Sequence, residues 1–175
     1  MSKKLTLKGF RMPGEWETQK SVWLIWPYNE KDWPKLFKKI PDVVGKISAC
    51  LSINQNVNLI IRNLKDISRI KKIIKKFKSK ISNIKFHSIK SDRIWIRDSG
   101  PIFLINKKTK NKIILNFKFN GWSKYKDFKK DDKLNLKISK ITKIKRVEPV
   151  IKAVSYTHLR AHETPEHLVC RLLLE

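Results

Sequence analysis

Short apolar runs alternate with a helical pattern in the first half of this chain. The segment 65–80 carries apolar residues at 3.6-residue spacing, which predicts an amphipathic helix with a solvated face of lysines. The flanking runs VNLIIR (57–62) and IKFHSI (84–89), and the earlier run SVWLIW (21–26), predict strands because they are rich in β-branched and aromatic residues. The expected order of these four elements is therefore strand, strand, helix and strand. The apolar positions of the helix are Ile67, Ile70, Ile73, Ile74 and Phe77.

A second helix is expected between the first two of these strands. Asp32 and Pro34 are typical of a helix start, and Pro41 is a point at which the helix could divide. Cys50 falls on the expected core-facing stripe, where a thiol usually behaves as an inert small hydrophobic group. The stripe comprises Val43, Val44, Ile47, Cys50 and Leu51.

The later part of the chain predicts a hairpin. PIFLI (101–105) and KIILNFKF (112–119) are strand-like runs joined by the turn sequence NKKTKN. A weakly periodic, lysine-rich stretch follows at 129–142. There is no sequence repeat, although a unit of strand, helix, strand and strand could be used more than once.

Bulk properties favour one cytoplasmic domain with a core. The 175 residues are 41% hydrophobic, and no apolar run reaches the roughly 18 residues that a membrane span needs. The N-terminus MSKKLTLKGF has no apolar segment after its positive charges, so export is not indicated. Cys50 and Cys170 do not form a disulfide framework, which fits a reducing compartment.

The formal net charge of +26 suggests a polyanion as partner. However, the lysines are spread through nearly every segment and accompany an excess of isoleucine and asparagine, which A/T-rich codons would supply together. We therefore favour genomic base bias as the explanation, and nucleic acid is an unlikely partner. A basic nucleic-acid-binding domain remains the alternative.

Composition changes sharply after Ala153. The segment 154–175 contains no Lys, Ile or Asn but holds three of the four histidines. It resembles the translation of a sequencing-library adapter. We therefore expect residues 1–153 to be part of an authentic domain and residues 154–175 to be a non-native tail, which fold arguments should leave out.

The tail offers a tempting metal site that we do not expect to be real. The pattern H-E-x-x-x-H from His162 to His167 is one residue longer than the zincin spacing, and Pro165 would break the helix that aligns such ligands. His158 and Cys170 complete the apparent ligand set. Neither a metal ion nor a cofactor is expected for this chain.

Three aromatic and acidic islands stand out from the lysine-rich background. They are RMPGEWETQKSVWLIWPYNEKDW (11–33), DRIWIRDSGP (92–101) and FNGWSKY (119–125). Aromatic faces and carboxylates are the side chains that recognise an organic cation, by cation–π attraction and by charge-assisted hydrogen bonds. A planar guanidinium fits this combination best, because a carboxylate can accept two of its N–H groups side by side.

In motif and order, these islands closely resemble the agmatine deiminase and Porphyromonas-type peptidylarginine deiminase family. The motifs are M-P-x-E-W, W-P-x-N and D-W, then W-x-R-D-x-G-P, then F-N-G-W, between Phe10 and Asp132. The resemblance implies a five-bladed α/β propeller, of which this chain would supply roughly the first two blades. It also implies hydrolysis of a guanidinium through a cysteine thiouronium intermediate, with a histidine as proton donor.

The same resemblance assigns roles to residues of the islands. Asp98 matches a catalytic carboxylate that holds the guanidinium, and Trp95 matches a residue that lines the substrate channel. Four tryptophans are expected to pack the first blade: Trp16, Trp23, Trp26 and Trp33. Residues with a structural role are Arg97, Gly100 and Pro101 in the turn, and Phe119, Asn120, Gly121 and Trp122 in the following motif.

The chain departs from the family pattern in its catalytic machinery. The E-G-G motif, the H-x-D pair and the late nucleophilic cysteine of the family are absent from the 175 residues. We therefore expect this chain to be an inactive fragment whose longer parent acts on a small cationic guanidino substrate and could be a homo-oligomer. Agmatine is favoured, and peptidylarginine is the alternative. A single Asp98-Ser99-Gly100 also matches the aspartic-peptidase tripeptide, but that chemistry needs two carboxylates.

Overall fold

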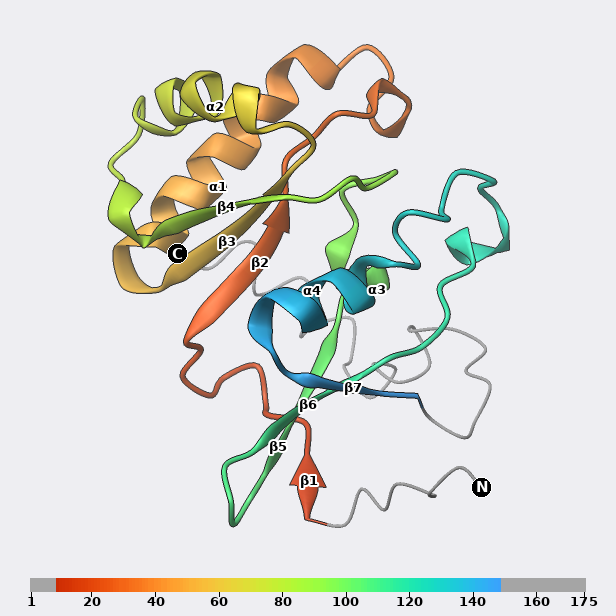
Figure 1. Ribbon diagram of the computed structural model, residues 1–175. Coiled ribbons are helices and arrows are strands. Elements are labelled where there is room, and N and C mark those ends of the chain that lie inside the picture. Colours follow the sequence, from red (N-terminus) through yellow and green to blue (C-terminus); the bar gives the residue numbers. More distant parts are fainter. Residues whose placement is uncertain (1–8, 149–175) are drawn as a thin grey trace.

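The computed structural model describes residues 9–148, which form a mixed α/β structure with two sheets (Figure 1). In chain order the elements are β1 (Phe10–Arg11), β2 (Ser21–Ile25), α1 (Ile40–Asn54), β3 (Asn56–Ile61), α2 (Ile67–Ile74), β4 (Ile84–Ser88), α3 (Ile96–Ser99), β5 (Ile102–Asn106), β6 (Lys112–Leu115), α4 (Leu134–Thr142) and β7 (Lys145–Val147). The predicted α/β class and the predicted strands are confirmed. The tail 154–175, with Cys170 and three of the four histidines, lies outside the described residues.

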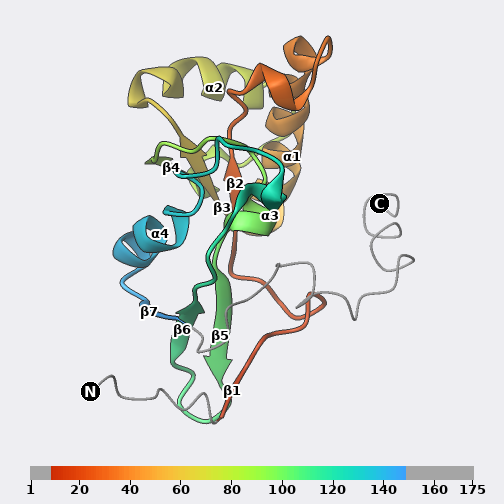
Figure 2. The ribbon, with the colours of Figure 1, turned by 90° about the vertical axis from the view of Figure 1, so that its right-hand side faces the viewer.

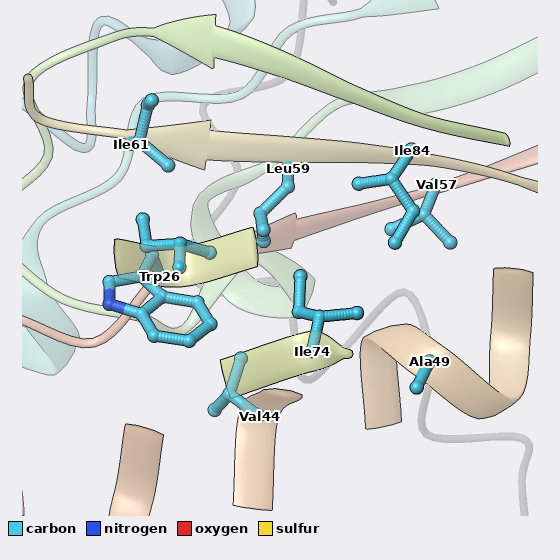
Figure 3. Close-up of a cluster of buried hydrophobic side chains, with 9 residues drawn as sticks. Trp26, Val44, Ala49, Val57, Leu59, Ile61, Ile74 and Ile84 are labelled. Carbon is cyan, nitrogen blue, oxygen red and sulfur yellow. The ribbon is translucent and has the colours of Figure 1, made fainter. Parts of the chain in front are cut away.

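The first sheet is parallel, with the strand order β2-β3-β4. Helices α1 and α2 connect its strands and cover one face (Figure 1). On the central strand β3, Val57, Leu59 and Ile61 point into the core beneath these helices, where Trp26 and Ile74 also pack (Figure 3). Each of these side chains is almost fully buried, so this cluster is the main hydrophobic core of the described residues.

The second sheet has the order β1-β5-β6-β7. The predicted hairpin is present as the antiparallel pair β5 and β6, and α4 then leads to β7, which pairs in parallel with β6. Leu134 and Ile138 of α4 pack against Ile60, on the face of the first sheet opposite α1 and α2, and against Ile114 of β6. Helix α4 thereby joins the two sheets, as Figure 2 shows from the side.

The expected start and inner face of α1 need correction. The helix begins at Ile40 with Pro41 in its first turn, so Pro41 does not divide it, and Asp32 and Pro34 precede it. The buried residues are Val44, Gly45, Ser48, Ala49 and Ser52, whereas the predicted stripe members Val43, Ile47 and Cys50 are exposed.

Close packing of α1 on α2 explains this rotated face. A Cβ atom on Gly45 would lie 2.7 Å from Ile73 Cγ2, so only glycine allows this approach of the two helices. The buried hydroxyls of Ser48 and Ser52 are satisfied within the helix, by donating to the carbonyls of Val44 and Ala49. Small residues therefore form much of the packed face together with Val44, whereas Val43 and Ile47 lie outside it.

The predicted packing of the tryptophans is correct for one residue and wrong for another. Trp26 is 2% exposed and its backbone N–H donates to Ile60 O, whereas Trp16 is 84% exposed. Trp16 lies beside a tight turn, in which Glu17 N donates to Gly14 O, and this turn precedes the first core strand. Trp23 and Trp33 are half-buried. Among residues 9–148, no helix is both long and apolar enough to cross a lipid bilayer.

Candidate functional site

Polar residues of the islands gather at one edge of the parallel sheet. The chain leaves β2 toward Asp32, and it leaves β4 toward Asp92 and Arg93. Carboxyl ends of neighbouring parallel strands meet at the same edge, which is where ligands bind in open α/β sheets. Strand topology therefore brings the first and second islands together, although Asp32 and Arg93 are 61 residues apart in the sequence.

The predicted substrate residues lie on one short helical turn just after this edge. Trp95 is the N-cap of α3, and the N–H groups of Asp98 and Ser99 donate to its carbonyl. Trp95 is 43% exposed and its ring lies 5.6 Å from that of Trp33 between centroids, at an angle of 38°. Asp98 is half-buried on the same turn. The turn thus carries an exposed indole ring and a carboxylate three residues apart, and Trp33 from the first island packs against that indole.

The other residues of the second motif fix this turn. A Cβ atom on Gly100 would lie 2.3 Å from Ile96 O, so glycine is required for the chain to leave the turn at this point. Pro101 follows, half-buried, directly before β5. Arg97 Nη2 donates to Glu15 Oε1 over 2.6 Å, which ties the turn to the M-P-x-E-W segment.

The F-N-G-W motif forms a tight aromatic turn. Gly121 and Trp122 both have positive φ values, of 65° and 57°. The buried ring of Phe119 contacts that of Trp122 edge to face, with centroids 4.9 Å apart. Asn120 Nδ2 donates to Ser123 Oγ across the turn. The structure therefore places these four residues in a turn that directs the following segment back toward the second island.

Arg93 occupies the centre of the polar cluster. Its guanidinium donates through Nη1 to Asp32 Oδ1 and through Nη2 to Asp127 Oδ1, the latter over 2.8 Å. Its Cζ atom lies 3.7 Å from the centroid of the Tyr125 ring. The side chain of Arg93 is 5% exposed and that of Asp32 is 1% exposed. Hydrogen bonding to Arg93 lowers the pKa of Asp127 from its ordinary value.

Asp131 holds the backbone beside this cluster. Its two carboxylate oxygens accept the N–H groups of Asp92 and Arg93, over 2.7 and 3.0 Å. Asp92 in turn accepts both the backbone N–H and the ammonium group of Lys130. Asp131 is 2% exposed, and burial raises its pKa to about 6.

This raised pKa predicts a pH-dependent contribution to stability. Between the unfolded value, about 3.9, and about 6, the folded chain binds the proton of Asp131 more tightly than the unfolded chain does. The free energy of unfolding should therefore fall as pH rises from 4 to 6, by on the order of 2 kcal/mol from this group. Urea unfolding of the wild-type chain and Asp131→Asn across this range tests it. Asparagine does not titrate, so its effect on the free energy of unfolding should be the same at every pH. If the difference in free energy of unfolding between wild type and variant does not change with pH, the expectation is wrong.

Neither the histidine nor the cysteine among the described residues lies on the α3 turn. Within residues 9–148, no three His, Cys, Asp or Glu side chains come together in a way that could hold a metal ion. Cys50 lies in the last part of α1, which ends just before β3 begins, and so near the opposite edge of the sheet from α3. His87 packs against Trp23 and pairs with Asn58 Oδ1 over 2.9 Å, as expected for a packed histidine.

Sequence reasoning missed the polar cluster around Arg93, which is buried except for Asp127. The residues concerned are Asp32, Asp92, Arg93, Asp127 and Asp131. The sequence did contain one usable signal. Acidic residues are scarce, 15 against 41 basic ones, and the aspartates of this cluster lie within or shortly after the three islands. Their pairings join segments far apart in sequence, and no local spacing indicates which partner each acid takes.

Sequence comparison finds curated relatives of this chain. A relative from Streptococcus mutans serotype c is 31% identical over 116 residues, which are 65% of this chain and 30% of that protein. An agmatine deiminase of Pseudomonas aeruginosa is 28% identical over 148 residues, covering 76% of this chain and 36% of that protein. The chain thus spans about a third of the length of the curated relatives it matches.

Solved structures show the same fold. The agmatine deiminase of Enterococcus faecalis superposes with a TM-score of 0.69 at 24% identity, over 81% of this chain and 38% of that one. An agmatine deiminase of C. jejuni with substrate bound gives a TM-score of 0.64 at 27% identity, over 82% of this chain and 41% of that one. The sequence pattern of Porphyromonas-type peptidyl-arginine deiminases matches residues 11–155. The chain therefore belongs to the Porphyromonas-type peptidyl-arginine deiminase family.

Proposed function

We propose that this chain is part of an agmatine deiminase, which hydrolyses agmatine to N-carbamoylputrescine and ammonia. Membership of the family and the likeness to agmatine deiminases support the proposal. The observation that carries it is that Trp95, on the same turn as Asp98, packs its ring against that of Trp33 at the carboxyl edge of the parallel sheet. These groups suit a flat cation on an aliphatic chain.

In this proposal Asp98 holds the guanidinium and Trp95 lines the channel that admits it. The carboxylate would accept two guanidinium N–H groups and hold the cation in place for attack on its central carbon, and it would stabilise the positive charge that returns in the thiouronium intermediate once ammonia has left. The attacking thiolate and the proton-donating histidine would come from parts of the longer protein that this chain does not include. By itself, the chain would supply recognition without the covalent step.

The wider architecture in this proposal is the five-bladed α/β propeller. The segment β5, β6, α4 and β7, in the order strand, strand, helix and strand, would be one blade of it. The parallel sheet β2-β3-β4 would be the neighbouring blade, and α4 packs between the two. Further blades would cover the apolar side chains that are exposed here, which include Leu136 and Ile141 of α4.

Peptidylarginine is the second candidate substrate, because the family carries that name. The two substrates differ in the group at the far end of the guanidinium's aliphatic chain, which is an amine in agmatine and a peptide backbone in peptidylarginine. Discrimination between them would depend on groups beyond Asp98. None of the described residues is assigned to contact that far end of the substrate.

Ammonia release tests the proposal. The source DNA is amplified beyond the codon of Lys152 with primers that exclude adapter sequence, and the continuous reading frame is expressed beside the 175-residue chain. We expect the longer protein to release ammonia from agmatine faster than from free arginine or an arginine peptide, and the short chain to match a no-protein control. Turnover by the short chain would disprove its inactivity. If the longer protein releases ammonia faster from the arginine peptide, the substrate is peptidylarginine and the agmatine proposal is wrong.

A further inference from the structure

A single buried guanidinium connects all three aromatic islands. Asp32 belongs to the first island, Arg93 to the second, and Tyr125 to the third, with Asp127 two residues beyond it. Arg93 contacts each of these residues from a side chain that is 5% exposed. A planar guanidinium can donate in two directions at once while one face rests on an aromatic ring. No other standard side chain offers this combination.

The backbone at Arg93 is held as firmly as its side chain. Asp131 accepts the N–H groups of both Asp92 and Arg93, over 2.7 and 3.0 Å. Asn29 Nδ2 donates to Asp92 O over 3.2 Å from the first island. Segments from before and after the second island therefore fix both the position of this dipeptide and the direction of its side chain.

These contacts lie immediately beside the residues that would bind substrate. Asp32 directly precedes Trp33, and Arg93 lies two residues before Trp95. The ion pair between Asp32 and Arg93 therefore joins the two backbone segments whose tryptophan rings meet at 5.6 Å and 38°. Trp95 also caps α3, the turn that carries Asp98. A shift of Arg93 would move the aromatic pair and the carboxylate relative to each other.

We propose that Arg93 is a positioning residue: by bridging Asp32 and Asp127 above Tyr125, it fixes Trp33 against Trp95 and holds the Trp95–Asp98 turn in its substrate-binding geometry. Its kinetic consequence rests on the proposed deiminase function. Its structural consequence, the geometry of the ring pair, does not depend on that function.

The structural consequence is measured on the 175-residue chain by circular dichroism. Two indole rings at this distance give an exciton couplet, which Trp33→Phe should remove. Arg93→Lys keeps the charge but lacks the planar fork, so it cannot bridge both carboxylates, and we expect it to remove most of the same couplet. The matched control is Arg69→Lys, at an exposed arginine 3.5 Å from Asp66, which should leave the couplet unchanged.

Retention of the couplet in a folded Arg93→Lys chain would overturn the proposal. If that variant does not fold, Asp127→Asn supplies the test, because Asp127 is 44% exposed and its loss weakens only the outer arm of the bridge. A reduced couplet in Asp127→Asn supports the proposal, and an unchanged couplet overturns it.

The kinetic consequence is measured on the longer protein. We expect Arg93→Lys to lower kcat for agmatine by about 10 to 100-fold while KM changes by less than about threefold, because displaced groups act on the reacting geometry more than on binding. An unchanged kcat in the folded variant would refute the positioning role. If the wild-type longer protein turns over no guanidino substrate, the proposed function fails, and the circular dichroism experiment still decides the role of Arg93.

Discussion

Asp98→Asn in the longer protein is expected to lower kcat/KM for agmatine by about 10²–10³-fold or more, which would leave little measurable turnover. Asparagine has nearly the same shape but carries no charge and offers one acceptor oxygen in place of two. A guanidinium would therefore lose a charge-assisted hydrogen bond in the state where its charge must be held. Because Asp98 is half-buried on a single helical turn, water can only partly replace the lost carboxylate.

The measurement is steady-state ammonia release, with Asp42→Asn as the matched control. Asp42 is exposed in the first turn of α1, where it pairs with Lys76 over 2.9 Å, so this change removes one carboxylate away from α3. We expect the control to keep wild-type kcat/KM within experimental error. Normal turnover by a folded Asp98→Asn variant would remove the role assigned to Asp98. Nucleic-acid binding that falls steeply with salt and ignores this mutation would favour the basic-domain alternative.

The sequence was most informative for helices and strands that are determined by the pattern of their own residues. The strand over 57–62 and the helix within 65–80 have uninterrupted patterns, and β3 and α2 lie there. The buried positions Ile70 and Ile74 of α2 belong to the predicted stripe. Helix ends were less accurate, since α2 ends at Ile74, and the short strands β1 and β7 were not predicted. Two or three residues carry too little pattern, so their strand pairing depends on the neighbours that the fold supplies.

Hydrophobicity predicted the inner face of α1 only in part: Val44 is buried and Leu51 packs against the core, as expected. Reading large apolar residues as core selected Val43, Ile47 and Cys50, all of which are exposed. The face is determined by the close approach of α1 to α2, which Gly45 permits. The sequence of α1 alone does not show how closely α2 approaches it. The same limit applies to Arg93, whose partners lie 61 and 34 residues away in the chain. Motif resemblance singled out Trp95 and Asp98 as candidates, but it indicated nothing about the charged residues that Arg93 brings together.

Trp26→Ala is expected to destabilise the chain by about 3–5 kcal/mol, whereas Trp16→Ala should change the free energy of unfolding by less than about 0.5 kcal/mol. Both tryptophans belong to the first island, so composition and local motif do not separate them. Trp26 is 2% exposed, and its ring fills the space between β3 and the helices α1 and α2, so truncation leaves a cavity in the main core (Figure 3).

Urea unfolding followed by circular dichroism compares the two variants with the wild-type chain. The backbone hydrogen bond from Trp26 to Ile60 survives the substitution, so the loss would report the side chain alone. Trp16 is 84% exposed and loses few contacts on truncation. Equal destabilisation by the two changes would mean that Trp16 is also buried in solution, as the packing hypothesis for all four tryptophans required. A large difference would show that a shared motif can combine one core residue with one surface residue, which only the three-dimensional arrangement distinguishes.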